Sequence, residues 1–253
     1  MHTLPEGKKI YFASDFHLGL PSGSTSRLRE QLLVNWLNSI IHDAHEVFLM
    51  GDVFDFWFEY KQVVPKGYTR LLGKLAELAD KGIRIHYFTG NHDMWVFTYF
   101  TEEFQAVMHR SVYEFSCMGK NFHIGHGDGL GKGDHGYKLI KKIFASPICQ
   151  FLFRWMHPDL GISIANFFSK RSRHKTGHLD EVFLGEDKER LIGYCREIAN
   201  KKPVDYFIFG HRHLLLDYPV SPTARYINLG DWFKGGYYAE FDGKELYLKS
   251  IAI

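Results

Sequence analysis

Short apolar runs alternate with polar stretches along this chain, and five of the runs end abruptly in Asp, Asn or His. In the first half, a strand-like run is followed by apolar residues at helical spacing and then by another strand-like run, and the sequence does this twice. The pattern predicts two consecutive β-α-β units. Their strands are expected at residues 10–14, 46–50 and 83–88, and their helices around residues 28–41 and 71–79.

After the second β-α-β unit, the pattern turns antiparallel at a predicted hairpin. Residues 112–117 and 121–124 are separated only by Met118-Gly119-Lys120, which predicts a hairpin. A short helix is expected to open at Thr101 and a longer one to cover residues 186–200. Further strands are predicted at residues 205–209, 214–220, 225–229, 237–241 and 246–251. The pattern therefore predicts a chain of the α/β (α+β) class, with two sheets and helices outside them.

Residues 131–180 interrupt this alternation. They contain apolar and aromatic stretches that are broken by Pro158 and Gly161. We interpret this segment as a helical cap insertion within a single domain that spans residues 1–253. An ordinary helical hairpin packed on the body of the protein is an equally open interpretation.

Charge is distributed unevenly. The formal net charge is only +2, so the chain lacks the overall basic field that is typical of nucleic-acid binding. Residues 132–175 nevertheless hold nine Lys or Arg against two Asp, a net of +7, which leaves −5 for the rest of the chain. A local basic field in an otherwise acidic protein favours an anionic ligand or an anionic membrane surface.

The three cysteines, Cys117, Cys149 and Cys195, are far apart and lack CxxC spacing, so we expect reduced thiols in a cytoplasmic protein. The first residues lack the apolar segment of a signal peptide, and we expect neither export by that route nor an integral membrane protein.

The five apolar runs deliver a consistent set of donors. Strands that end at one edge of a sheet bring the residues after them together, and this edge is where sheet-based metal sites form. Carboxylate, amide and imidazole donors in this mixture suit Mn²⁺, Fe²⁺ or Zn²⁺ rather than a cysteine-rich structural zinc site. Two ions that share Asp52 would use all seven donors, and such a pair stabilises the attacking and leaving oxygens of a displacement at phosphorus. The candidate metal ligands are Asp15, His17, Asp52, Asn91, His126, His211 and His213.

These residues lie in motifs that resemble a known family, the calcineurin-like metallophosphoesterases. The resemblance covers residues 10–215. It implies a four-layer α-β-β-α sandwich and two divalent metal ions, with Mn²⁺ as the expected ion. One ion would take Asp15, His17, Asp52 and His213, and the other Asp52, Asn91, His126 and His211. The motifs are Asp15-x-His17, Gly51-Asp52-x-x-Asp55, Gly90-Asn91-His92-Asp93, His126-Gly127-Asp128 and Gly210-His211-x-His213.

The same resemblance implies a catalytic role for His92 beside the metals. It would act as the acid for the leaving group or as a donor to phosphate, and Asp55 or Asp93 would orient it. The implied catalytic residues are therefore His92, Asp52 and Asp55.

A narrower resemblance, to the family of UDP-2,3-diacylglucosamine diphosphatases of lipid A biosynthesis, concerns the substrate. It rests on Asp15-Phe-His-Leu-Gly, on the basic insertion and on Asn228-Leu-Gly-Asp-Trp232. It implies hydrolysis of UDP-2,3-diacylglucosamine to UMP and a diacylglucosamine 1-phosphate, by a cytoplasmic protein peripheral on the anionic inner membrane. The implied substrate-binding residues are Asn91, His92, Asp134, Tyr137, Arg171, Arg173 and Lys175.

Two other functions stay open at this point. The third motif has the general family form Asn91-His92-Asp93-Met94, where the best-known members of the narrower family carry Asn-Arg-Asp-Phe. A metal-dependent phosphodiesterase or nuclease acting on soluble nucleotides or nucleic acid is therefore the alternative, although no nucleic-acid partner is expected from the charge. A scaffold without activity is disfavoured because every metal ligand is present. The sequence leaves the oligomeric state open.

Overall fold

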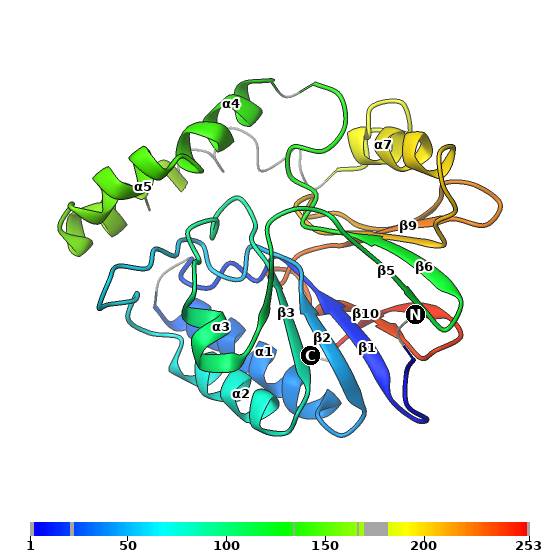
Figure 1. Ribbon diagram of the computed structural model, residues 1–253, viewed down its shortest axis with the longest axis horizontal. Coiled ribbons are helices and arrows are strands. Elements are labelled where there is room, and N and C mark those ends of the chain that lie inside the picture. The colour runs from blue at the N-terminus through cyan, green and yellow to red at the C-terminus, as the bar shows by residue number, and fades with distance from the viewer. Residues whose placement is uncertain (1–2, 21–22, 134, 166, 170–181, 252–253) are drawn as a thin grey trace.

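Two β-sheets form the centre of the molecule (Figure 1). The computed structural model describes residues 3–20, 23–133, 135–165, 167–169 and 182–251. The first sheet has the strand order β11-β10-β1-β2-β3-β4. Its strands are β1 (Lys9–Ala13), β2 (Ala44–Leu49), β3 (Arg84–Phe88), β4 (Val107–His109), β10 (Tyr237–Phe241) and β11 (Leu246–Ser250).

The second sheet has the strand order β5-β6-β7-β9-β8. Strands β6, β7 and β9 run parallel to one another, whereas β5 and β8 are antiparallel to their neighbours. The strands are β5 (Tyr113–Cys117), β6 (Lys120–Ile124), β7 (Tyr206–Phe209), β8 (Leu215–Pro219) and β9 (Arg225–Leu229).

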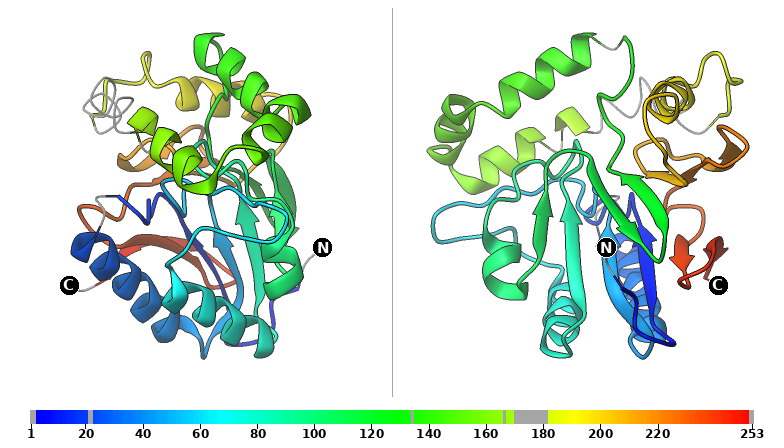
Figure 2. Two further views of the ribbon diagram at one scale, coloured as in Figure 1. Left: turned by 90° about the vertical axis from the view of Figure 1, so that its left-hand side faces the viewer. Right: turned by 45° about the vertical axis from the view of Figure 1, so that its right-hand side comes forward.

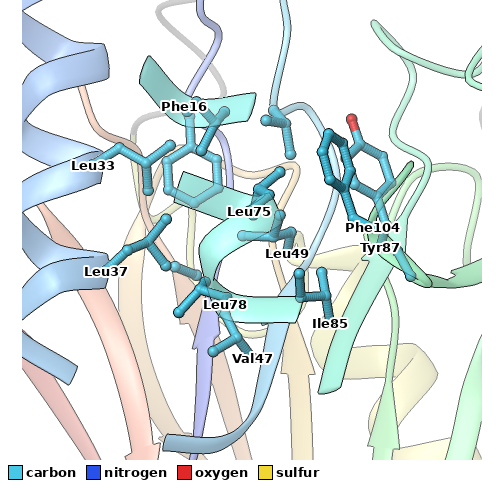
Figure 3. Packing of buried hydrophobic residues seen from close by; sticks show 14 of the residues in the cluster. Phe16, Leu33, Leu37, Val47, Leu49, Leu75, Leu78, Ile85, Tyr87 and Phe104 are labelled. Atoms are coloured by element: carbon cyan, nitrogen blue, oxygen red, sulfur yellow. The ribbon is translucent and has the colours of Figure 1, made fainter. Parts of the chain in front are cut away.

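Helices cover the outer faces of both sheets. Helices α1 (Ser24–Ile40), α2 (Thr69–Asp80) and α3 (Tyr99–Phe104) lie against the first sheet, and α7 (Arg190–Ala199) lies against the second (Figures 1 and 2). Figure 3 shows the first of these interfaces, where leucines of α1 and α2 pack against alternate residues of β2 and β3. The predicted α-β-β-α order of layers is therefore confirmed.

Successive side chains of each strand point to opposite faces of its sheet, and this alternation explains how the layers pack. In β1, Tyr11 packs under the helices while Ile10 and Phe12 point into the space between the sheets. In β7, Ile208 faces the first sheet and Phe207 faces α7. Because both faces of these strands are covered, they are apolar on both sides, as the continuous apolar runs of the sequence indicated.

The predicted elements are present, but several boundaries and pairings differ; helix α7, for example, begins at Arg190 rather than at residue 186. Strand β4 has no strong periodicity and was not predicted; it lies at the sheet edge, where pairing with β3 alone forms it. Helix α3 begins at Tyr99, two residues before the expected start. The carboxy-terminal hairpin of β10 and β11 joins the first sheet, where β10 pairs antiparallel with β1, a long-range choice that local sequence does not encode.

The segment predicted as an insertion is helical where it is described. Helices α4 (His135–Phe144) and α5 (Pro147–Arg154) lie beyond the ends of the central strands (Figures 1 and 2), and residues 158–165 and 167–169 are also helical. Residues 134, 166 and 170–181 lie outside the described part of the chain.

All three cysteines are free; Cys117 and Cys195 are buried and Cys149 is half-buried on α5. Among the described residues, no helix combines the length and apolarity that a membrane crossing requires.

The contact between the two sheets generates a stability prediction. Phe12 is completely buried, and its ring centroid lies 4.9 Å from that of Phe48 and 6.1 Å from that of Phe122 on the second sheet. We expect Phe12→Ala to lower the free energy of unfolding by about 3–5 kcal/mol because it leaves a cavity between the sheets. Urea unfolding followed by circular dichroism measures this loss.

The control is Leu28→Ala on α1, where the side chain is 65% exposed. Its effect should stay within about 0.5 kcal/mol. If Phe12→Ala and Leu28→Ala lowered the free energy of unfolding equally, this would contradict a stabilising core between the sheets.

Candidate metal centre

All seven predicted metal ligands follow the carboxyl ends of buried strands. Asp15 and His17 come after β1, Asp52 after β2, and Asn91 after β3. In the second sheet, His126 follows β6, and His211 and His213 follow β7. The two sheets therefore deliver their donors to one shared edge.

Asp52 lies at the centre of this cluster and is 1% exposed. Its Oδ2 lies 3.6 Å from Nε2 of His17 on one side and 3.4 Å from Nε2 of His126 on the other. Its Oδ1 accepts a hydrogen bond of 2.8 Å from the backbone N–H of His92. One carboxylate oxygen thus faces both halves of the donor set, which is the arrangement that a bridging ligand requires.

The first half of the cluster consists of Asp15, His17 and His213. Nε2 of His17 lies 3.7 Å and Nε2 of His213 lies 3.4 Å from Oδ1 of Asp15, and the two Nε2 atoms are 3.1 Å apart. This buried Oδ1 accepts no hydrogen bond within the described part of the chain. A buried carboxylate oxygen facing two imidazole nitrogens has the chemistry of a divalent cation site, so these residues fit a metal ion.

The second half consists of Asn91, His126 and His211, with Asp52 shared. Oδ1 of Asn91 lies 3.2 Å from Nε2 of His126 and 2.9 Å from Nδ1 of His211. Nδ1 of His126 lies 2.9 Å from the carbonyl oxygen of Met50, a contact that favours the tautomer whose Nε2 carries a lone pair for a metal.

The electrostatics of the cluster follow from burial and mutual proximity. Burial opposes ionisation of Asp52, but the nearby imidazoles of His126 and His92 outweigh it and hold the pKa of Asp52 well below its usual range. Burial also acts against the charged form of His126, yet the Asp52 carboxylate raises its pKa to about 10. Burial and the neighbouring His126 lower the pKa of His211 to about 4. The carboxylates therefore stay ionised and depend on positive charge close by.

The backbone is bent sharply at the ligands. Asp15, His17, Asp52 and His211 have φ values of 57°, 44°, 51° and 66°, in the left-handed region that most residues avoid. Such conformations cost free energy and persist only where the surroundings hold them. They turn each side chain back toward the shared edge immediately after its strand ends.

Glycines in the motifs allow this close approach. A Cβ atom on Gly90 would overlap the side chain of Asp52, and one on Gly210 would overlap Ser14 and Asp15. Only glycine therefore fits at these two close approaches between neighbouring loops.

Several supporting residues were not identified from the sequence. Ser14 donates to Oδ2 of Asp15 at 2.5 Å. Arg29, from α1, donates to the carbonyl oxygens of Phe16 and His17 at 2.6 and 2.7 Å and so holds the turn that carries His17. No local signal marks Arg29, since its role depends on where α1 packs.

Asn228 belongs to the motif at residues 228–232 that the sequence analysis singled out, and the structure shows what its side chain holds in place. It is fully buried, and its Nδ2 donates to the carbonyl oxygen of Gly210 at 2.8 Å. Asn228 therefore fixes the loop that carries His211 and His213.

His92 lies beside the cluster on the side of Asp55. Its Nδ1 is 3.1 Å from the carbonyl oxygen of Asp55 and 3.5 Å from Oδ1 of the same residue. Asp93 instead accepts hydrogen bonds from Tyr87 and from the backbone of Val53 and Gly90. Of the two orienting residues that the sequence left open, Asp55 is the one in contact with His92.

The insertion reaches the centre on two sides. Ser169 donates to Oδ2 of Asp55 at 3.0 Å and its Oγ lies 3.5 Å from Nδ1 of His92. On α4, the Tyr137 hydroxyl donates to Oδ2 of Asp128, and Lys141 lies 2.6 Å from the same oxygen.

An aromatic anchor joins the insertion to the body. The Trp95 indole donates to the carbonyl oxygen of Phe144 at 2.8 Å, and its ring lies 4.6 Å from that of Phe153. Of the predicted substrate contacts, Asn91, His92 and Tyr137 lie at the centre or its border, whereas Asp134, Arg171, Arg173 and Lys175 lie outside the described residues.

Comparisons with known proteins agree with this geometry. The family model described as calcineurin-like phosphoesterase matches residues 8–215. The chain is 38% identical to a UDP-2,3-diacylglucosamine hydrolase of Porphyromonas gingivalis, covering 96% of this chain and 97% of that relative. It is 26% identical to the Histophilus somni (strain 129Pt) protein of the same name, covering 89% and 92%.

Among solved structures, the chain is similar to a novel archaeal phosphodiesterase with a TM-score of 0.48. The two are 13% identical, over 96% of this chain and 99% of that chain.

The shared position of Asp52 generates a prediction about metal binding. We expect Asp52→Asn to weaken binding of at least one of two Mn²⁺ ions by about tenfold or more, because the bridging charge is lost while the shape is kept. Isothermal titration calorimetry on chelator-treated protein measures both affinity and stoichiometry.

Asp159→Asn is the matched control, since that carboxylate is 93% exposed on the insertion. It should bind Mn²⁺ as the unmodified protein does. Two ions bound by Asp52→Asn with unchanged affinity would contradict the bridging position.

Proposed function

The chain belongs to the calcineurin-like phosphoesterase family, and on this premise we propose that it hydrolyses UDP-2,3-diacylglucosamine to UMP and 2,3-diacylglucosamine 1-phosphate. The observation that carries the proposal is the near full-length similarity to hydrolases named for this substrate. The convergence of seven donors around Asp52 supports the hydrolytic chemistry, and the reaction would belong to lipid A biosynthesis.

We assign the two metal positions by the contacts of the ligands. Asp15, His17, Asp52 and His213 would hold one divalent ion, and Asp52, Asn91, His126 and His211 the other. We propose Mn²⁺ as the native ion, with Fe²⁺ and Zn²⁺ compatible with the same donors. When bound, the two ions supply Lewis acidity at phosphorus and lower the pKa of a bound water.

The chain's own residues position the reacting groups. Water adds to the phosphorus nearer uridine, the bond to the bridging oxygen breaks, and diacylglucosamine 1-phosphate leaves. We assign His92 as the group that stabilises the leaving phosphate or gives it a proton. Asp55 holds Nδ1 of His92, so the other nitrogen of the ring is left to face the substrate.

The surface of the insertion suits a lipid substrate. Twelve of the 22 exposed large apolar side chains among the described residues lie between residues 139 and 168, and they include Trp155 at 78% exposure. An exposed apolar surface of this kind marks a site for lipid or another apolar partner. We propose that this surface, with the basic residues Arg171, Arg173 and Lys175, holds the protein peripherally on the cytoplasmic face of the anionic inner membrane.

The proposal predicts a defined product. Purified protein with Mn²⁺ and UDP-2,3-diacylglucosamine should release UMP, detected by anion-exchange chromatography, and an excess of EDTA should stop the release because the donors need the ions. Cleavage of cyclic nucleotides or bis-aryl phosphodiesters with the lipid left intact would instead favour the soluble phosphodiesterase alternative.

A second prediction concerns His92. We expect His92→Ala to lower kcat by about 10²- to 10⁴-fold, because stabilisation of the leaving group is lost, while Mn²⁺ binding changes little. Steady-state kinetics and calorimetry separate the two effects. His157→Ala, whose side chain is 74% exposed, is the control and should keep full activity. A His92→Ala variant with unchanged kcat would contradict the assignment.

A further inference from the structure

A basic cleft opens beside His126 at the metal centre, and His92 is not among the residues that line it. It has a volume of about 830 Å³ and lies between α4 and the loops that follow β3, β4 and β6. Its lining includes His126, so the cleft begins at one of the candidate metal ligands. The volume falls within the range of pockets that bury a ligand of drug or nucleotide size, roughly 300–1,000 Å³.

The lining of the cleft combines mostly apolar surface with a group of basic side chains. Among the described residues, four basic side chains, Arg110, Lys138, Lys141 and Lys142, line it together with one carboxylate, Asp128. Two of the cations are held in place: Arg110 donates to the carbonyl oxygen of Val96 at 2.5 Å, and Lys138 donates to that of Gly131 at 2.6 Å. Fixed positive charge beside a metal centre favours an anionic, polar ligand.

One face of α4 forms the roof of this cleft. His135, Lys138, Leu139 and Lys142 all line it and recur at three- and four-residue spacing, so they share a face of the helix. Exposed apolar residues further along the insertion, such as Phe151, Trp155 and Phe167, are not among the residues that line the cleft. The exposed apolar residues beyond Ala145 therefore lie outside the cleft, whereas Leu139 belongs to it.

The centre itself has two distinct sides. Asp52 lies between them, with Oδ1 accepting from the backbone of His92 and Oδ2 lying 3.4 Å from Nε2 of His126. On the His92 side is Ser169, whose Oγ lies 3.5 Å from Nδ1 of His92. On the His126 side is the basic cleft.

We propose that the cleft binds the nucleotide half of the substrate, that is, the uridine monophosphate part. The inference rests on the proposed function and adds an orientation to it. In that function His92 serves the leaving group, so diacylglucosamine 1-phosphate departs on the His92 side, next to the apolar part of the insertion. The half that keeps the attacked phosphorus then extends past His126 into the cleft, where Lys142 and Arg110 meet its charge and Thr89 and Ser111 add hydroxyl groups.

The test compares the two products as ligands of the Mn²⁺-loaded protein. UMP binding is measured by calorimetry, and inhibition by UMP and by 2,3-diacylglucosamine 1-phosphate is measured against the substrate. We expect Lys142→Glu to weaken the binding of UMP at least about fivefold. Inhibition by diacylglucosamine 1-phosphate should change by less than about twofold, because that product would lie on the other side of Asp52.

A second variant tests shape rather than charge. Leu139 is 60% exposed on α4 and lines the cleft, so Leu139→Trp should narrow it without disturbing a core. We expect UMP to bind about threefold more weakly or worse, again with little change for the lipid product. The control is Lys132→Glu, which reverses an exposed charge of the same segment outside the lining and should leave both products unchanged.

The outcomes separate this inference from the proposed function. If Lys142→Glu and Leu139→Trp weaken the binding of diacylglucosamine 1-phosphate and leave the binding of UMP unchanged, the proposed orientation is wrong, although the enzyme is the proposed hydrolase. If Lys132→Glu weakens the binding of UMP as much as Lys142→Glu does, the overall positive charge of the segment explains the binding and not the cleft. The inference then fails. If the unmodified protein cleaves only simple phosphodiesters and binds neither product, the proposed function fails and the orientation with it.

Discussion

Burial of the Asp52 carboxylate is the constraint on which the rest of the structure depends. An ionised group that is 1% exposed must be compensated by nearby charge or hydrogen bonds, and at this position the compensation comes from imidazoles and a backbone N–H. Those partners arrive from both sheets, with His17 following β1 and His126 following β6. The two sheets therefore need a fixed offset relative to each other, and the aromatic layer between them, in which Phe12 stacks on Phe48 and Phe122, provides it.

The same constraint accounts for the strained loops. Regular strands would carry the residues that follow them away from the shared edge, so the chain turns back at once through left-handed conformations at Asp15 and Asp52. Free energy stored in these turns is offset by the contacts around them, among them the hydrogen bonds from Arg29 to the β1 turn and from Asn228 to the β7 turn. A pre-shaped donor set of this kind lowers the reorganisation needed when a metal ion binds.

Local sequence predicted the parts of this arrangement that depend on local physics. Period-two and helical spacing identified the layers because each strand and helix must bury its own apolar side. The ligands were predicted because each stands directly after an apolar run. Arg29 and Ser169 could not be predicted, since one acts from a helix 12 or more residues away and the other crosses from residue 169 to residue 55. For the same reason, no local pattern indicated that β10 would pair with β1.

The helical insertion contacts residues on both sides of the metal centre. Through Ser169 it contacts the Asp55 and His92 pair, and through Tyr137 and Lys141 it contacts Asp128, two residues beyond His126. A cover attached only by the Trp95 anchor could move without affecting either side of the centre. Because it holds hydrogen bonds on both sides of Asp52, any displacement of the insertion changes the surroundings of His92 and of His126 together. Its basic face and its apolar surface then contact the surroundings of the same donor set, so one segment can align two chemically different halves of a substrate across a single pair of metal positions.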